Sequence, residues 1–136
     1  MILNIHLLTV HQIIKMIKSF LLVGLGGAIG AMFRYLLSGL WKTNIFPFST
    51  LLINIIGSIA IGIVLALSEK NQLVSANLKL FLATGICGGF TTFSTFSAEN
   101  MVLIKAGNYA TAGLYIFTSV AVCIFAIFAV FKFINN

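Results

Sequence analysis

Charged residues are scarce in this chain. Of its 136 residues, 7% are charged and only two are acidic, whereas 60% are hydrophobic. Soluble domains usually carry about 25% charged residues, and a soluble helical protein of this size would need a polar face on every helix. No such faces are present in the sequence, so a soluble fold is excluded. We predict an all-α protein that lies within a membrane.

Cysteine and acidic residues are also too few for several kinds of site. The two cysteines, Cys87 and Cys123, lie in apolar segments, where a thiol behaves as a small hydrophobic group. They provide neither a disulfide framework nor a metal-binding spacing. No nucleophile, base and orienting group can be assembled, so we predict no enzyme. The net charge of +6 is scattered through loops and span ends, which argues against a nucleic-acid partner.

The length of the chain limits the number of membrane spans. A spanning helix needs roughly 20 apolar residues, so the chain holds about four spans joined by short loops. We predict a membrane domain over residues 18–136, with spans at 18–40, 48–67, 78–104 and 109–133. Residues 1–17 form an N-terminal extension, which either lies at the membrane interface or is absent if translation starts at Met16.

Small residues and basic residues indicate how the spans pack and insert. Gly26 and Gly30 have the spacing that lets two helix backbones approach closely in lipid. Four spans put both termini on one side of the membrane, and the excess of basic residues on that side is small, which is a weak orienting signal. We therefore expect insertion in both orientations. The basic residues compared are Lys15, Lys18, Lys70, Lys79 and Lys132 on the terminal side, against Arg34, Lys42 and Lys105.

The third span contains a segment that disfavours a continuous helix. Gly88 and Gly89 are followed by hydroxyl residues and phenylalanines over residues 88–94. Unpaired backbone groups at the bilayer centre cost several kcal/mol each unless a cavity, an ion, water or another subunit satisfies them. Broken helices at this depth recur at ion sites. The alternative is a seam of small residues that packs against a neighbouring helix.

Side chains beyond this segment are suited to an anion. Phe93 and Phe96 lie three residues apart, and the edge of an aromatic ring carries partial positive charge. The hydroxyls of Thr92, Ser94 and Thr95 and the amide of Asn54 are donors that can replace an anion's water. The alternatives are that both rings face lipid or the core, and that Asn54, near the middle of its span, makes an interhelical hydrogen bond.

Polar residues in the other spans are less informative. Tyr115, Ser119 and Cys123 are spaced four residues apart, which stacks them on one helix face. Such a stripe is either a polar track along a pore or ordinary packing. Arg34 and Glu99 lie toward the ends of their spans, where either could be a charge whose side chain extends to the interface.

Three segments of the chain together are similar to one family. The sequence resembles the CrcB/Fluc-type fluoride channels in Gly26-Gly27-x-x-Gly30-Ala31-x-x-Arg34-Tyr35, in Thr50-Leu51-x-x-Asn54-x-x-Gly57-Ser58, and in Gly85-x-Cys87-Gly88-Gly89-Phe90-Thr91-Thr92-Phe93-Ser94-Thr95-Phe96-Ser97-x-Glu99. These motifs follow one another in the family's order, with its loop lengths. The fourth span matches more loosely.

This resemblance implies an antiparallel, dual-topology homodimer in the cell membrane, with two pathways for the passive export of cytoplasmic fluoride. It implies a structural sodium ion at the dimer centre, held by the backbone carbonyls of Gly88 and Thr91. Arg34, Gly26 and Gly30 would be structural or vestibule residues, and Cys123 stands where the family usually has a hydroxyl. The fluoride pathway would contain Asn54, Phe93 and Phe96, with Thr50 and Glu99 nearer its ends, the hydroxyls of Thr92, Ser94 and Thr95, and Tyr115 and Ser119 on the fourth helix.

Two other classes share some of these features. A small proton-coupled four-helix multidrug exporter has the same size, short loops and dual insertion, but it needs a carboxylate in the first span. Residues 21–32 contain none. A membrane assembly subunit that transports nothing would use its glycine seams for packing alone.

Overall fold

The computed structural model describes residues 2–40, 46–70 and 74–136, and over these ranges it contains helices and no strand. Four helical segments in this part of the chain are long and apolar enough to cross a membrane: Thr9–Gly39, Phe48–Lys70, Ala76–Lys105 and Tyr109–Asn135. The prediction of an all-α protein with four spans is confirmed. The chain is a multi-pass membrane protein.

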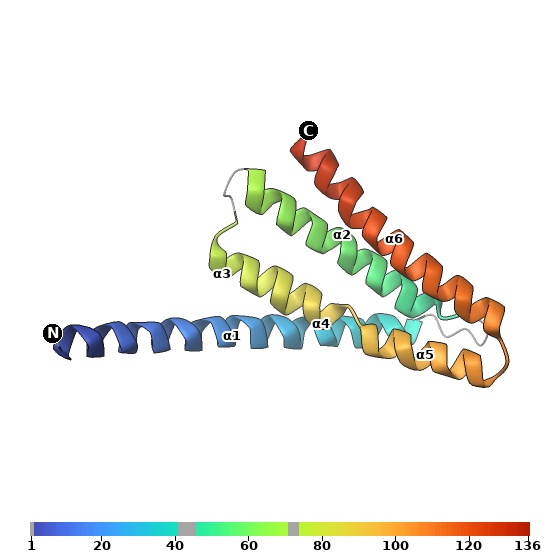
Figure 1. Ribbon diagram of the computed structural model, residues 1–136, viewed down its shortest axis with the longest axis horizontal. Coiled ribbons are helices and arrows are strands. Elements are labelled where there is room, and N and C mark those ends of the chain that lie inside the picture. The colour runs from blue at the N-terminus through green and yellow to red at the C-terminus, as the bar shows by residue number, and fades with distance from the viewer. Residues whose placement is uncertain (1, 41–45, 71–73) are drawn as a thin grey trace.

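The first helix, α1 (Ile2–Leu40), has 39 residues. Its first half extends beyond the other helices (Figure 1). The sequence suggested an extension ending at residue 17 and a span beginning at residue 18, whereas α1 continues through this point without interruption. Met1, one of the two candidate starts, and the loop residue Lys42 lie outside the described residues.

Helices α2 (Phe48–Lys70) and α6 (Tyr109–Asn135) make the most extensive helix pair. They lie side by side along much of their length (Figure 1). Helix α2 begins directly after Pro47, where a proline is tolerated because its missing amide would have no partner in the first turn. At the far end, the ammonium group of Lys70 donates a hydrogen bond to the carbonyl of Ile134. Both helices continue two to three residues beyond their predicted ends.

The third span is divided into several pieces. It comprises α3 (Ala76–Lys79), the π-helical η1 (Leu80–Cys87), α4 (Gly88–Phe90) and α5 (Phe93–Lys105). Between α4 and α5, Thr91 and Thr92 have extended backbones. The predicted interruption is confirmed, but it is shorter than the sequence suggested. The glycine pair stays helical, and the break occupies the two threonines, roughly midway along the span.

A seam of glycines joins α1 to the first half of the third span. A Cβ atom built on Gly26 would lie 2.5 Å from the carbonyl oxygen of Phe81, and one on Gly30 would overlap the carbonyl of Ile86. Neither residue has room for a side chain, so the two backbones touch directly. The prediction of close backbone approach at this pair is confirmed.

The turn between α5 and α6 brings these two helices together. The amide of Asn108 donates to the carbonyl of Leu103 (2.9 Å), and the amide of Gly107 donates to that of Ile104 (3.0 Å). This pair of bonds is the Schellman motif, which needs a left-handed residue just after the helix. Gly107 supplies it with φ of 79°. The chain therefore reverses direction, and α6 returns along α5.

Candidate functional site

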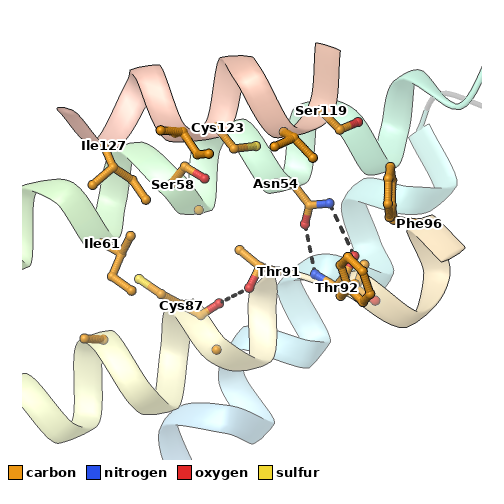
Figure 2. Close-up of a pocket in the computed structure, with 16 residues that line it drawn as sticks. Asn54, Ser58, Ile61, Cys87, Thr91, Thr92, Phe96, Ser119, Cys123 and Ile127 are labelled. Atoms are coloured by element: carbon orange, nitrogen blue, oxygen red, sulfur yellow. Dashed lines mark hydrogen bonds between the residues drawn. The ribbon is translucent and has the colours of Figure 1, made fainter. Parts of the chain in front are cut away.

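The helix break is held open by one side chain of α2. The Thr92 amide donates to Asn54 Oδ1 at 2.9 Å, and Asn54 Nδ2 donates to the Thr92 carbonyl at 3.3 Å. Both bonds are drawn in Figure 2. Asn54 thus pairs with the extended backbone as a neighbouring peptide group would. Of the two alternatives for Asn54, the interhelical hydrogen bond is the one observed in the single subunit.

The break also redirects backbone hydrogen bonds. In an α-helix each amide donates to the carbonyl four residues earlier. The Thr92 amide, which would serve Gly88, is bonded to Asn54 instead. The Thr95 amide, which would serve Thr91, donates to Thr92 Oγ1 at 3.1 Å and thereby caps α5. The carbonyls of Gly88 and Thr91 have therefore both lost their usual helical donors.

Arg34 reaches this region from α1. Its Nε donates to the carbonyl of Gly89 at 3.1 Å, and the side chain is half-buried. Arg34 does not extend to the interface, which was one possibility from the sequence. It borders a cavity of about 310 Å³ whose polar lining comes from three spans. That lining consists of Arg34, Tyr35, Ser38, Thr50, Thr92 and Thr95.

Glu99 joins three spans. Its two carboxylate oxygens accept hydrogen bonds from Thr50 Oγ1 (2.7 Å) and from the hydroxyl of Tyr115 (2.8 Å). Tyr115 is fully buried and Thr50 is buried, while Glu99 is half-buried. Two of the predicted polar residues thus donate to the third, and the carboxylate points inward rather than to the membrane surface.

A larger cavity, of about 380 Å³, lies between α2, the third span and α6. Figure 2 shows its lining side chains pointing toward one another from these helices. Thr92 also lines the 310 Å³ cavity beside Arg34, so this residue forms part of the wall between the two spaces. The polar members of the larger cavity's lining are Asn54, Ser58, Thr91, Thr92 and Ser119.

The two phenylalanines beyond the break have different surroundings. Their ring centroids are 5.5 Å apart, which confirms that they share one side of α5. Phe96 is 8% exposed and packs on Tyr115, with centroids 5.0 Å apart, whereas Phe93 is 78% exposed. Both rings border the larger cavity. Phe96 is therefore part of the subunit's core, and Phe93 is presented outward.

The stripe on α6 faces the same region. The Ser119 hydroxyl is buried and has no hydrogen-bond partner within the described residues. Cys123, one turn further along, lines the cavity with it. Ser94, by contrast, is exposed and contacts Thr92 Oγ1 at 3.3 Å, so it contributes to the helix cap rather than to the cavity wall. Gly26 and Gly30 lie apart from this cavity, in the seam.

Asn100 is a polar residue that the sequence analysis missed. It is 6% exposed, its Nδ2 donates to the Phe96 carbonyl at 2.9 Å, and its Oδ1 has no partner in the described structure. Its position four residues after Phe96, on the same face of an apolar span, was the available signal.

Comparison with known proteins adds a second kind of information. A family model described as CrcB-like protein, camphor resistance (CrcB), matches residues 21–131. The chain is 46% identical over 108 residues to a protein of Azobacteroides pseudotrichonymphae named fluoride-specific ion channel FluC, covering 77% of this chain and 86% of that protein. A protein of Leptospira interrogans with the same name is 48% identical over 107 residues, covering 76% of this chain and 84% of its own length. One from Shewanella sp. strain ANA-3 is 39% identical over 115 residues, covering 82% and 91%.

Proposed function

Because this chain belongs to the CrcB-like family, we propose that it is a subunit of a fluoride-selective ion channel, and not an enzyme. Relatives 39–48% identical to it are named fluoride-specific ion channels. The observation that carries the proposal is the lining of the 380 Å³ cavity. There an amide, a free hydroxyl and two aromatic rings meet without a carboxylate. Such a lining suits a small, strongly hydrated anion, and conduction is passive.

The donors near the break replace the water of the ion. The Ser119 hydroxyl is buried and without a partner, so it can donate to an anion at no cost in existing bonds. The edges of Phe93 and Phe96 carry partial positive charge, which attracts an anion. The same edges do not attract a cation. The Arg34 guanidinium, in the adjoining cavity, draws anions toward the Thr92 wall. Selectivity then depends on the number and field of the donors.

Glu99 acts in this scheme by orienting hydroxyls. Its carboxylate holds Thr50 and Tyr115 with their oxygen atoms fixed in position. A carboxylate that accepts two hydrogen bonds presents less negative charge to a passing anion than a free one. The exported ion is the fluoride that accumulates in the cytoplasm, and its gradient and the membrane potential drive the flux.

The subunit functions as an antiparallel homodimer with dual topology. Phe93, at the middle of its span, is 78% exposed in the isolated subunit, and it borders the larger cavity, which is not enclosed. A second copy that covers this face buries the ring and completes the cavity wall. The weak charge bias of the loops is compatible with insertion in both orientations.

The residues at the break suit a structural sodium ion at the dimer centre. Oxygen ligands are those that hard cations prefer, and the carbonyls of Gly88 and Thr91 have lost their helical donors to Asn54 and Thr92. These two carbonyls from each subunit would hold the ion. When bound, it supplies a fixed positive charge near the fluoride pathway.

A flux measurement in liposomes tests the function. Purified protein is reconstituted with internal potassium fluoride or potassium chloride, and valinomycin sets the voltage that drives anion efflux. We expect rapid fluoride efflux and far slower chloride efflux. Equal leakage of both anions, or none, would end the channel proposal. Efflux of a lipophilic cation driven only by a pH gradient would favour the exporter, and no transport at all would favour the assembly subunit.

A separate experiment tests the sodium ion. Purification and detergent dilution are carried out in sodium and, in parallel, in N-methylglucamine. We expect the dimer to dissociate sooner when sodium is replaced. Indifference of the dimer to the cation would count against the carbonyl site while leaving the fluoride channel intact.

A further inference from the structure

Helix α1 is longer than the membrane it crosses. Its spanning segment Thr9–Gly39 has 31 residues, about 46 Å at 1.5 Å per residue, against a hydrocarbon core of about 30 Å. The family match begins at residue 21, so the first turns of α1 lie outside it. Figure 1 shows this end of the helix reaching past α3 with no other helix beside it.

The protruding turns have two different faces. Val10, Ile14 and Ile17 are all exposed and are spaced four and three residues apart, so they form one apolar stripe. His11, Lys15 and Lys18 are also exposed and repeat the same spacing one residue later, so they form a basic stripe beside the apolar one. A basic amphipathic helix of this kind is typical of membrane surfaces.

The apolar stripe continues into the part of α1 that crosses the membrane. Leu21 and Leu25 extend it with the same spacing and are exposed. Gly26 and Gly30, on the other side of α1, are the residues buried against η1. The stripe is therefore the outward face of a spanning helix. Lipid is the partner at the membrane end of this face, and the same face runs without interruption into the protruding turns.

A local hydrogen bond marks the junction between the two parts. Ser19 Oγ donates to the carbonyl of Lys15 at 3.0 Å. Hydrogen bonds from a serine to the carbonyl four residues earlier compete with the helical amide and bend helices. Helix α1 is continuous through Ser19, and this is the position at which a bend would turn residues 9–18 away from the membrane normal.

We propose that residues 9–18 form an interfacial helix that lies in the headgroup layer of an anionic phospholipid leaflet. The apolar stripe faces the acyl chains, and Lys15 and Lys18 lie against lipid phosphates. Because the segment is covalently joined to a span, its effective concentration at the membrane surface is high. If it continued straight into water, Val10, Ile14 and Ile17 would all be solvated there.

Tryptophan fluorescence tests this proposal in the full chain. Trp41→Phe removes the chain's one tryptophan, and Ile14→Trp then reports on the apolar stripe, with His11→Trp as the matched control on the basic stripe. Both are reconstituted in phosphatidylcholine vesicles with or without phosphatidylglycerol. We expect Ile14→Trp to be quenched several-fold more than His11→Trp by lipids brominated near the glycerol, and several-fold less by aqueous iodide. The difference should grow when phosphatidylglycerol is present.

Three results would overturn the proposal. Equal iodide quenching of both reporters would mean that the segment projects into water. An Ile14→Trp reporter shielded from iodide but insensitive to brominated lipid would mean that protein, such as a second copy of the helix, covers the stripe. Identical signals with and without phosphatidylglycerol would show that anionic headgroups do not bind the segment. Val10→Trp, on the same stripe, gives an independent measurement if Ile14→Trp does not fold.

Discussion

The two halves of the third span are held to their neighbours by different forces. Before the break, η1 and α4 lie against α1 through a glycine seam in which backbones touch. After the break, α5 is held by side chains, through the Glu99 hydrogen bonds to Thr50 and Tyr115 and the tilted ring contact between Phe96 and Tyr115. Only Thr91 and Thr92 separate the two halves.

This difference indicates that the first half of the span serves mainly the assembly of the helices and the second half mainly conduction. Lipid provides no hydrophobic drive between helices, so close packing of small residues must supply the attraction in the first half. The second half contains a carboxylate, Glu99, whose two hydrogen-bond donors come from two other spans. A substitution in the first half should therefore damage assembly, and one in the second half should damage conduction first. The following experiments test this separation.

The largest effect is expected at the glycine seam. In Gly30→Ala, the new methyl group would overlap the Ile86 carbonyl and lie 2.8 Å from the Phe90 amide nitrogen. Both obstacles are backbone, so the helices must move apart, at about 1–3 kcal/mol or more. We expect little monodisperse protein in detergent and a much lower melting temperature. Gly24→Ala is the matched control, since a Cβ there meets nothing within 4 Å. Equal stability of the two variants would contradict the claim that the glycine contacts between α1 and η1 stabilise the fold.

The next effect is expected at the residue that joins the two halves. Asn54→Leu leaves the amide and carbonyl of Thr92 without their side-chain partner, and each unsatisfied buried group costs about 1–3 kcal/mol. We expect a lower melting temperature, and a fall in fluoride flux of about tenfold if the lost amide raises the barrier to the ion by about 1.4 kcal/mol.

The control for this experiment is Asn77→Leu, because Asn77 is exposed at the start of the third span. It should change neither quantity. A variant of Asn54 that loses flux while its melting temperature stays unchanged would show that the amide acts on the ion alone. The two hydrogen bonds between Asn54 and the Thr92 backbone would then not be needed to stabilise the break.

The sequence allowed the fold to be predicted closely and the break less so. Hydropathy alone gave four spans, because length and apolar composition leave no other solution for this chain. It also indicated an interrupted third helix. The break was expected to include Gly88 and Gly89, yet these remain helical. The small size of Gly89 is used for packing, since a Cβ there would overlap backbone of Gly27, whereas a Cβ on Gly88 would meet its nearest atom only at 3.9 Å.

Partners across spans were beyond the reach of the sequence. Nothing in the spacing of Glu99, Thr50 and Tyr115 indicates that both hydroxyls meet one carboxylate, because the contact depends on how α2, α5 and α6 rotate against one another. Asn100 was missed for a related reason. Its spacing of four residues from Phe96 shows that the two side chains share a helix face, but which face is buried depends on where the neighbouring helix lies.

A smaller effect is expected at the carboxylate of the second half. Glu99→Gln keeps the shape of the side chain but puts an NH₂ donor where one of the two hydroxyls now donates. Hydrogen bonds to a charged group are worth about 1.5–3 kcal/mol, against about 1 kcal/mol for a neutral pair. We expect a several-fold change in fluoride flux with the subunit still folded.

Glu69→Gln is the matched control for this carboxylate, since Glu69 is the chain's other acid and is exposed. Its flux should equal that of the parent in the same liposome assay. If both variants had the same fluoride flux, the Glu99 carboxylate would matter no more than an exposed one. Its hydrogen bonds would then have no role in conduction.

The smallest effect on the fold is expected at the outward-facing ring. Phe93→Ile removes a side chain that is 78% exposed in the subunit, whereas Phe96→Ile removes one that is 8% exposed and packed against Tyr115. Only the second leaves a gap in the core, so melting temperature should fall for Phe96→Ile and stay near the parent value for Phe93→Ile. Fluoride flux should fall in both, by about 2- to 13-fold if each ring edge contributes about 0.5–1.5 kcal/mol. The dimer should persist. Unchanged flux in both variants would show that the ring edges do not contact the ion. Conduction after the break would then depend on hydroxyl and amide donors alone.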